Sequence, residues 1–299
     1  MVTNIIKTLE ISVPVIDCIS LLICLPGCMF ILVVNILDWR KNKRLDINDQ
    51  LISGLGILIL IYRSFQASFS CTLQIYEFYV ITSLAWFYIY LTYYSLGFLT
   101  LVFSTWLSIH FCLKIVNINQ NIYIYIQHNF PKMFPWILLP SVLASLLISG
   151  PVAQNMSEQS LNFNDSLLYP SSSPLTTLLS VQLYFVFFAF CFLIIVISLL
   201  LTIVSLYRHI QRMQSFRSEM VEAHVSAVKM LIALIGFNLT FFALMFLFML
   251  KRHEPVWMTA AVLSNASFHI LAIPIIIRGS RKLHIMLHKI LLHCMTSVS

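Results

Sequence analysis

The sequence predicts an all-α membrane protein that folds as a single domain, residues 1–299, with seven transmembrane helices. Hydrophobic residues make up 60% of the chain and charged residues only 10%, far from the usage of soluble domains. Apolar runs of about 20 or more residues recur along the whole length, and each could cross a hydrocarbon layer of about 30 Å as a helix. Basic residues gather in alternate loops, which is typical of polytopic membrane proteins.

The first three predicted helices are separated by polar or basic segments. The helix at 11–37 shows no signal-peptidase site and ends before the basic run from Arg40 to Arg44, so we expect it to serve also as the targeting signal. The helix at 51–73 begins after a short polar turn. The helix at 81–113 contains no Asp, Glu, Lys or Arg and opens with aromatic residues.

Four further helices follow at similar spacing. The helix at 134–153 has no charged residue, and the helix at 178–207 contains a long run without a single charge. The helices at 225–250 and 256–277 complete the bundle. The sequence shows no inverted repeat or pair of broken half-helices of the kind found in secondary transporters.

The tail, residues 278–299, carries basic residues and His among Leu, Ile and Met at helical spacing. We expect this cytoplasmic tail to form an amphipathic helix on the inner leaflet. His284 and His288 share a helix face, but no further ligand lies near them in the sequence, so we expect no metal site and no cofactor. No nucleophile and base pattern is present, so the sequence does not predict an enzyme.

The distribution of basic residues predicts the orientation. One side of the predicted bundle collects most Lys and Arg, while the other has only Lys7, Lys251 and Arg252. Under the positive-inside rule the N-terminus is outside and the C-terminus inside. The net charge of +7 then reflects topology and contact with anionic lipid, and it predicts no nucleic-acid partner. The cytoplasmic set is Arg40, Lys41, Lys43, Arg44, Lys114, Lys132, Arg208, Arg212, Arg217, Lys229, Arg278, Arg281, Lys282 and Lys289.

The segment 154–177 is predicted to be a glycosylated extracellular loop. It is polar and contains Asn-x-Ser sequons at Asn155 and Asn164. Two further sequons, at Asn238 and Asn265, fall inside predicted helices and are rejected because glycan transfer needs a lumenal loop. The loop sequons agree with the orientation that the basic residues indicate.

Five stretches at the ends of the predicted helices match, in order, the patterns of one receptor family. They are FILVVNILDWRKNKRLDINDQL at 30–51, LSIHFCLKIVNI at 107–118, SLYRHIQRMQ at 205–214, AHVSAVK at 223–229 and GSRKL at 279–283. Together they resemble the bitter taste receptor family (type 2 taste receptors). The chain is identified as a divergent member, since the family's helix-two Arg would fall at Ile59, where this chain instead has Arg63 one turn farther out.

The resemblance implies a G-protein-coupled chemosensory receptor with a seven-helix bundle in the plasma membrane. Such a receptor would detect bitter small molecules from outside and activate a gustducin-like heterotrimeric G protein inside. A vomeronasal type 1 (pheromone) receptor is the nearest alternative. A small-molecule transporter or channel is the alternative from another class.

The resemblance also implies two groups of functional residues. Core packing explains Tyr93, Tyr94 and Gly97 as well as a ligand pocket does, and basic loop residues orient any membrane protein. The residues expected to bind ligand are Tyr93, Tyr94, Gly97, Tyr184, Phe188, Phe241, Phe242, Met245 and Asn265. The residues expected to face the G protein are Lys41, Arg44, His110, Lys114, Arg208, His209, Arg212, Met213, His224 and Lys229.

Three polar residues inside the predicted helices are expected to be structural. Asp17 and Arg63 are ionisable groups deep in predicted spans, where such groups are costly unless paired. We expect them to pair and tie helices one and two together, with a direct ligand contact of Arg63 as the alternative. Asn35 belongs to the first family-like stretch and is expected to be structural. The aromatic residues from Trp86 to Tyr90 are expected to form an interfacial belt.

Overall fold

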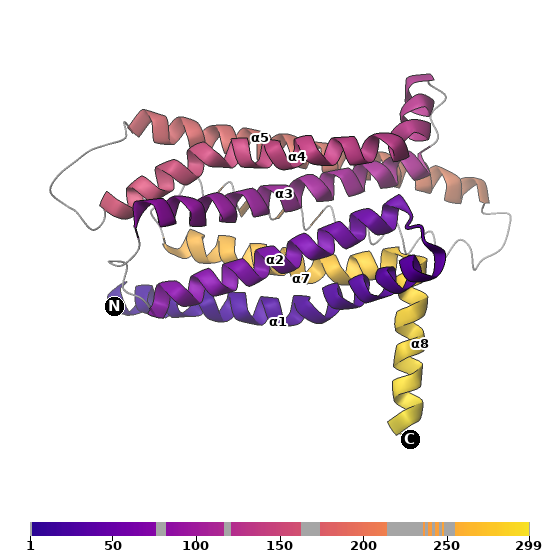
Figure 1. Cartoon of the computed structure of the whole chain (residues 1–299), viewed down its shortest axis with the longest axis horizontal. Helices are drawn as coiled ribbons and strands as arrows, with labels where there is room; N and C mark the ends of the chain where they lie inside the picture. Colours follow the sequence, from indigo (N-terminus) through magenta and orange to yellow (C-terminus); the bar gives the residue numbers. More distant parts are fainter. Residues whose placement is uncertain are drawn as a thin grey trace. The chain divides into compact units, whose positions relative to one another are not determined.

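The computed structural model is all-helical throughout the residues it describes (Figure 1). These residues are 2–75, 82–116, 121–162, 174–213 and 255–298, with single positions between 236 and 247. The fold class predicted from the sequence is therefore confirmed. The predicted helix at 225–250 lies almost entirely outside the described residues.

Seven helices are described, and five of them are longer than the apolar runs that predicted them. The third has the same length as the predicted run but is shifted by two residues, and the last lies within the predicted tail. Five contain stretches long and apolar enough to cross a membrane: 12–42, 47–72, 84–115, 132–158 and 179–208. A shorter apolar stretch covers 263–278. The helices are α1 (Val2–Asn42), α2 (Ile47–Ile75), α3 (Ser83–Ile115), α4 (Asn121–Asn162), α5 (Pro174–Met213), α7 (Pro255–Gly279) and α8 (Arg281–Val298).

The helix ends lie beyond the predicted ones because backbone hydrogen bonding continues after the apolar residues stop. At the end of α1, Lys43 adopts a left-handed φ of 55° and its N–H donates to the carbonyl of Trp39 at 2.8 Å. A left-handed residue just after the last turn is a common way to end a helix. α3 starts at a different kind of cap, where the Thr82 hydroxyl accepts a hydrogen bond from the N–H of Ala85.

The chain forms two compact units. The first contains residues 1–60 and 199–299, and the second contains residues 61–198. In the first unit α1 packs along α7, and α8 leaves the end of α7 and runs across the direction of both helices (Figure 1). A Cβ added at Gly27 of α1 would lie well under 3.0 Å from the side chain of Ile273 of α7. Glycine therefore allows these two helices to approach closely.

In the second unit α3 packs along α4. Four small residues of α4 recur at every fourth position and are nearly or fully buried: Ser141, Ser145, Ser149 and Ala153. Small residues at this spacing let helix backbones approach in membranes. The indole N–H of Trp106 on α3 donates to the hydroxyl of Ser141 at 3.2 Å, so the small-residue face of α4 also supplies a polar link.

Candidate functional site

Aromatic residues repeat at every fourth position along one face of α3. Trp86, Tyr90, Tyr94 and Phe98 follow this spacing, which places side chains in register on a helix. Consecutive rings along the first three positions lie 5.6 Å and 6.4 Å apart. Trp86 is only 1% exposed, and its ring meets that of Phe69 edge to face. The expectation of an interfacial belt is therefore wrong for Trp86, which faces protein because this face of α3 packs against α2.

Three predicted ligand residues come together at the middle of this face. The rings of Tyr93 and Tyr94 lie 5.4 Å apart, and the ring of Tyr94 lies 5.6 Å from that of Tyr184 on α5. The Tyr184 hydroxyl donates to the backbone carbonyl of Tyr94 at 3.3 Å. Tyr62 of α2 extends the same cluster, with its ring 5.7 Å from that of Tyr93. We call Tyr62, Tyr93, Tyr94 and Tyr184 the tyrosine cluster.

The other predicted ligand residues are distributed differently. A Cβ at Gly97 would be in ordinary contact, 3.6 Å, with the ring of Tyr62, so Gly97 borders the tyrosine cluster. Phe188 lies one turn after Tyr184 on α5 and is buried. Asn265 lies half-buried on α7, in the first unit. Phe241, Phe242 and Met245 lie outside the described residues.

Arg63 is fully buried, and the structure gives it neighbours that the sequence did not predict. Its guanidinium donates to the side-chain oxygen of Gln66 at 2.9 Å and lies 5.8 Å from the ring centre of Tyr62. Asp17 is also buried, but it belongs to the first unit whereas Arg63 belongs to the second. Their expected pairing stays a prediction.

The C-terminal end of α3 is capped by side chains of α4. The last carbonyls of a helix have no partner within it. The Tyr123 hydroxyl lies 3.1 Å from the carbonyl of Cys112 and 2.9 Å from that of Val116, and the Gln127 amide donates to the carbonyl of Leu113 at 2.8 Å. Burial, with a smaller effect of Cys112, raises the pKa of Tyr123 to about 12, so the hydroxyl remains a donor at neutral pH.

The predicted G-protein-facing residues on α3 lie beside this cap. The ring of His110 stacks on that of Phe130 of α4, with centres 5.5 Å apart, and Lys114 is exposed. Arg208 is exposed near the end of α5. The helix α5 includes His209, Arg212 and Met213, whose side chains are not described, and His224 and Lys229 lie outside the described residues.

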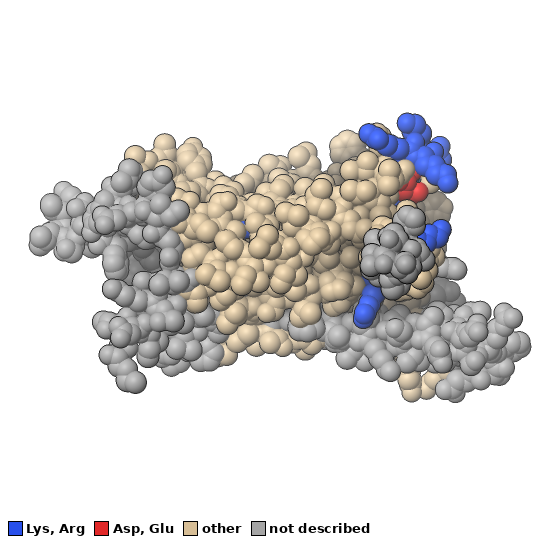
Figure 2. All heavy atoms as spheres, turned by 90° about the horizontal axis from the view of Figure 1, so that it is seen from below, with Lys and Arg blue, Asp and Glu red and all other residues tan. Residues whose placement is uncertain are grey.

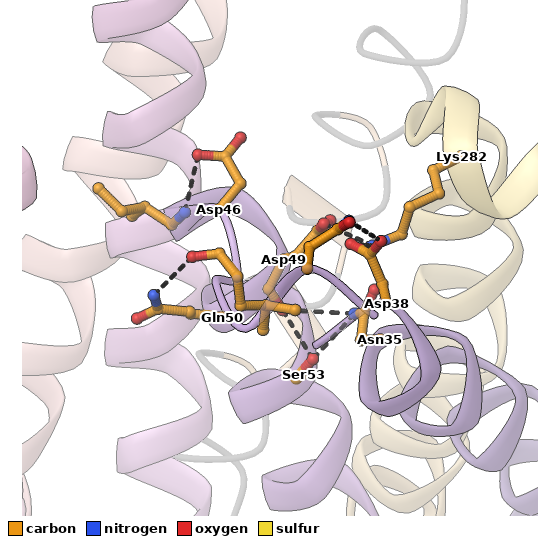
Figure 3. Close-up of polar contacts among 10 residues, drawn as sticks. Asn35, Asp38, Asp46, Asp49, Gln50, Ser53 and Lys282 are labelled. Atoms are coloured by element: carbon orange, nitrogen blue, oxygen red, sulfur yellow. Dashed lines mark hydrogen bonds and ion pairs between the residues drawn. The ribbon is translucent and has the colours of Figure 1, made fainter. Parts of the chain in front are cut away.

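A polar cluster joins the ends of α1, α2 and α8 within the first unit (Figure 3). The Lys282 ammonium of α8 lies 2.9 Å from a carboxylate oxygen of Asp38 and 2.6 Å from one of Asp49. Asn35, 2% exposed, donates to the hydroxyl of Ser53 at 2.8 Å and lies 3.4 Å from the carbonyl of Asp49. Asn35 thus joins α1 to α2, a contact that the sequence did not specify.

Lys282 supplies the positive charge that pairs with the two carboxylates of this cluster. Burial alone lowers the pKa of Lys282, but hydrogen bonds and attraction from Asp49 and Asp38 outweigh it, so the pKa is raised above its ordinary value. Lys282 therefore remains charged at neutral pH. The sequence predicted only a basic residue on the cytoplasmic side, because nothing in the linear order brings position 282 to positions 38 and 49.

The first predicted glycosylation site is not in a loop. α4 continues to Asn162, and Asn155 is a helical residue that is 8% exposed. Its amide nitrogen donates to the carbonyl of Pro151 and to the hydroxyl of Ser180. The expected loop from Gln154 differs from the structure because the helix persists into polar residues. Asn164 lies outside the described residues.

Five spans, an aromatic core and charged clusters at helix ends define the class as a polytopic helical membrane protein. A family model described as taste receptor protein (TAS2R) matches residues 2–295. The chain therefore belongs to the taste receptor family, a family of seven-helix, multi-pass membrane receptors of the G-protein-coupled class.

Individual members of the family show moderate identity to the chain. It is 29% identical over 229 residues to taste receptor type 2 member 2 of Homo sapiens, covering 72% of this chain and 73% of that protein. Identity to member 4 of Pan troglodytes is 30% over 229 residues, 68% and 70% of the two chains. Identity to member 41 of Gorilla gorilla gorilla is 34% over 145 residues, 45% and 47% of the two chains. These matches disfavour the vomeronasal and transporter alternatives.

Proposed function

We propose that this chain is a bitter taste receptor that detects small molecules from outside the cell and activates a gustducin-like heterotrimeric G protein inside. The proposal treats the chain as a receptor and not as an enzyme. The observation that carries it is the family match over residues 2–295, which covers the described helices from α1 to α7 and most of α8. The five family-like stretches at helix ends support the same assignment, since helix ends are where such receptors meet their G protein.

The orientation is part of the proposal, with the N-terminus outside and the C-terminus inside. It rests on the positive-inside rule. In the first unit, exposed basic residues cluster where α1 ends and around α8. In the second unit, Lys114 ends α3 and Lys132 lies in the early part of α4.

We propose the tyrosine cluster, with Gly97 and Phe188, as the agonist-binding region. Its rings offer broad apolar faces, and its hydroxyls offer a few polar anchors. Such a combination suits small, largely apolar and chemically varied agonists. On the family resemblance alone, Phe241, Phe242, Met245 and Asn265 are also proposed as agonist contacts.

We propose that the cytoplasmic ends of α3 and α5 contact the G protein through His110, Lys114 and Arg208. On the family resemblance alone, His209, Arg212, Met213, His224 and Lys229 are also proposed as G-protein contacts. An agonist can activate the receptor only by binding its active state more tightly than its resting state. Lys41 and Arg44, which were expected on this face, have surroundings that favour another partner, described below.

The proposal is tested by calcium release in cells that express the full chain with a promiscuous, gustducin-tailed G protein. Cells are challenged with a panel of bitter compounds, and surface expression is measured in parallel. We expect Tyr184→Ala to raise the EC50 of a panel agonist about tenfold, the effect of losing one buried aromatic contact of about 1.4 kcal/mol. The matched control is Tyr88→Ala, because Tyr88 is an α3 tyrosine that is 57% exposed.

Two outcomes would count against the proposal. Silence across the panel at normal surface expression would contradict bitter detection. A ligand-dependent flux that needs no G protein would instead favour the transporter alternative. Equal shifts in Tyr184→Ala and Tyr88→Ala would leave the receptor assignment standing and remove the tyrosine cluster as the binding region.

A further inference from the structure

The turn between α1 and α2 presents a dense group of cations. Arg40, Lys41, Lys43 and Arg44 lie within five residues and are all exposed. Arg40 and Lys41 lie in the last turn of α1, which the left-handed conformation at Lys43 ends, so Lys43 and Arg44 lie in the turn that follows. Figure 2 shows Lys and Arg side chains gathered together, with an acidic side chain beside them. We call residues 39–44 the cationic turn.

The carboxylates near the cationic turn already have other donors. Asp38 accepts from the amide of Asn42 at 2.7 Å and from Lys282, and Asp49 pairs with Lys282 as well. A carboxylate oxygen of Asp46 accepts from the N–H of Ile47 at 2.9 Å. In the described part of the chain, by contrast, Arg40, Lys41 and Arg44 form no hydrogen bond or ion pair. Asp38 and Asp49 thus pair with Lys282 and not with the cations of the cationic turn.

An exposed tryptophan sits within the same turn. Trp39 is 52% exposed, and the ammonium of Lys43 lies 5.8 Å from its ring centre. Trp and Lys at the end of an apolar span are typical of the membrane interface, where the ring sits at the level of the headgroups. α8 belongs to the same unit, runs across the direction of α1 (Figure 1), and exposes Ile285, Ile290 and Leu292. An amphipathic helix that crosses the direction of a spanning helix can lie along the bilayer surface.

From these observations we infer that the cationic turn binds the headgroup of a polyphosphorylated inositol lipid in the inner leaflet. The two guanidinium groups can each grip a phosphate with paired N–H donors, and the two ammonium groups add point charges. A headgroup with several phosphates can use all four cations at once, whereas a headgroup with a single charge cannot. Trp39 and the exposed apolar residues of α8 would hold the turn at headgroup depth.

A lipid fits this surface better than an acidic segment of a protein. The cations adjoin an exposed tryptophan, and the unit that carries them also contains a helix with exposed apolar residues. A lipid headgroup lies above hydrocarbon and satisfies both features, whereas an acidic peptide satisfies only the charges. The inference rests on the proposed orientation, which puts the cationic turn in the cytoplasm, but its test needs no agonist and no G protein.

Binding can be measured with full-length receptor purified in detergent micelles. The probe is a short-chain phosphatidylinositol 4,5-bisphosphate, titrated by thermophoresis at low salt, with short-chain phosphatidylserine as the singly charged comparison. The test variant is R40Q/R44Q. Its matched control is K114Q/K132Q, which removes the same charge from two exposed lysines of the second unit.

We expect R40Q/R44Q to weaken binding of the bisphosphate lipid roughly 25-fold, about fivefold for each cation removed near a lipid surface. K114Q/K132Q should leave binding within about twofold, and higher salt should weaken binding to the native chain because it screens the charges. Equal losses in both pairs would overturn the inference, since they would indicate only general attraction to a basic protein. Equal affinity for phosphatidylserine would also overturn it.

A protein partner at the cationic turn would give another pattern. R40Q/R44Q would then retain lipid binding but lose agonist-stimulated nucleotide exchange on the G protein. That result would contradict the inference while leaving the proposed receptor function standing. Conversely, lipid binding that depends on Arg40 and Arg44 in a receptor that never signals would count against the proposed function alone.

Discussion

Lys282 shows how a single side chain can join three helices of this protein. Its ammonium group pairs with Asp38 at the end of α1 and with Asp49 in the first turn of α2, while its backbone begins α8. The partners lie more than two hundred residues away in the chain. Asn35 donates to the Ser53 hydroxyl, which donates to the backbone carbonyl of Asp49, so the ion pairs adjoin a part-buried hydrogen-bonded network.

The first prediction concerns the ion pairs of Lys282. Lys282→Met should lower the free energy of unfolding by about 0.5–1 kcal/mol, because the pairs are partly exposed and solvent screens them. Thermal unfolding of the purified receptor in detergent measures the change. Lys289→Met, on the exposed part of α8, is the matched control and should be neutral. An equal effect of the two substitutions would contradict the assigned role.

The same ion pairs have a definite pH dependence. The pKa of Lys282 is raised in the folded state, so its contribution to stability is complete below the ordinary lysine pKa of 10.5 and is lost as the pH rises through the folded value. The stability difference between the native chain and Lys282→Met should therefore stay constant between about pH 6 and 9. A difference that shrinks within this range would show that another group carries the effect.

At the scale of elements, side chains of α4 cap the C-terminal end of α3. The end of α3 leaves carbonyl groups without helical partners. The Gln127 amide of α4 donates to the Leu113 carbonyl, and the Tyr123 hydroxyl lies within hydrogen-bond distance of the Val116 and Cys112 carbonyls, of which that of Cys112 also accepts the Val116 N–H. His110 stacks on Phe130 one turn earlier, so polar and aromatic contacts act together. This arrangement fixes the end of α3 that we propose to face the G protein.

The second prediction tests this cap by removing the hydroxyl oxygen of Tyr123. Tyr123→Phe keeps the ring but removes the hydroxyl donor of the part-buried Val116 carbonyl, which should cost about 1–3 kcal/mol of stability. Tyr125→Phe makes the same change on a side chain that is 66% exposed and should be neutral. Thermal unfolding compares the two variants at equal expression. If the end of α3 also matters for coupling, only Tyr123→Phe should lower the maximal calcium response while leaving the agonist EC50 unchanged.

At the scale of the whole molecule, orientation decides whether the segment 154–177 can be glycosylated, and helix packing decides which of its sequons is accessible. Both sequons of the segment 154–177 were expected to be used. In the structure the amide nitrogen of Asn155, the atom that would bond to a sugar, instead donates to Pro151 and Ser180 within a helix. Asn164 stands in a polar stretch of sequence rich in Asn and Ser.

The third prediction follows from this difference. In mammalian cells Asn164→Gln should abolish the shift in gel mobility that a glycosidase causes, whereas Asn155→Gln should leave that shift intact. Loss of the shift in Asn155→Gln alone would mean that the glycan is added before α4 forms. No shift in the native chain would argue against an outside location of this segment and therefore against the proposed orientation.

The sequence by itself determined the membrane class, the approximate helices and the family. Each apolar run is a local feature of the chain, and its length alone predicts that it crosses the membrane. The five family-like stretches are also local, since each lies within a short segment. The family resemblance also pointed to Tyr93, Tyr94 and Tyr184 as ligand residues, which stays a prediction. The helix ends were less accurate, since hydrogen bonding carries a helix past its last apolar residue.

Only the tertiary structure decided which side chains meet. The pairing of Lys282 with Asp38 and Asp49, the capping of α3 by Tyr123, and the burial of Trp86 and Asn155 all depend on how separate helices pack. Helical periodicity gives the face of each residue on its own helix but not the neighbouring helix or its depth. For the same reason the sequence showed the basic residues of the cationic turn, while the structure showed that the nearby carboxylates already have other partners.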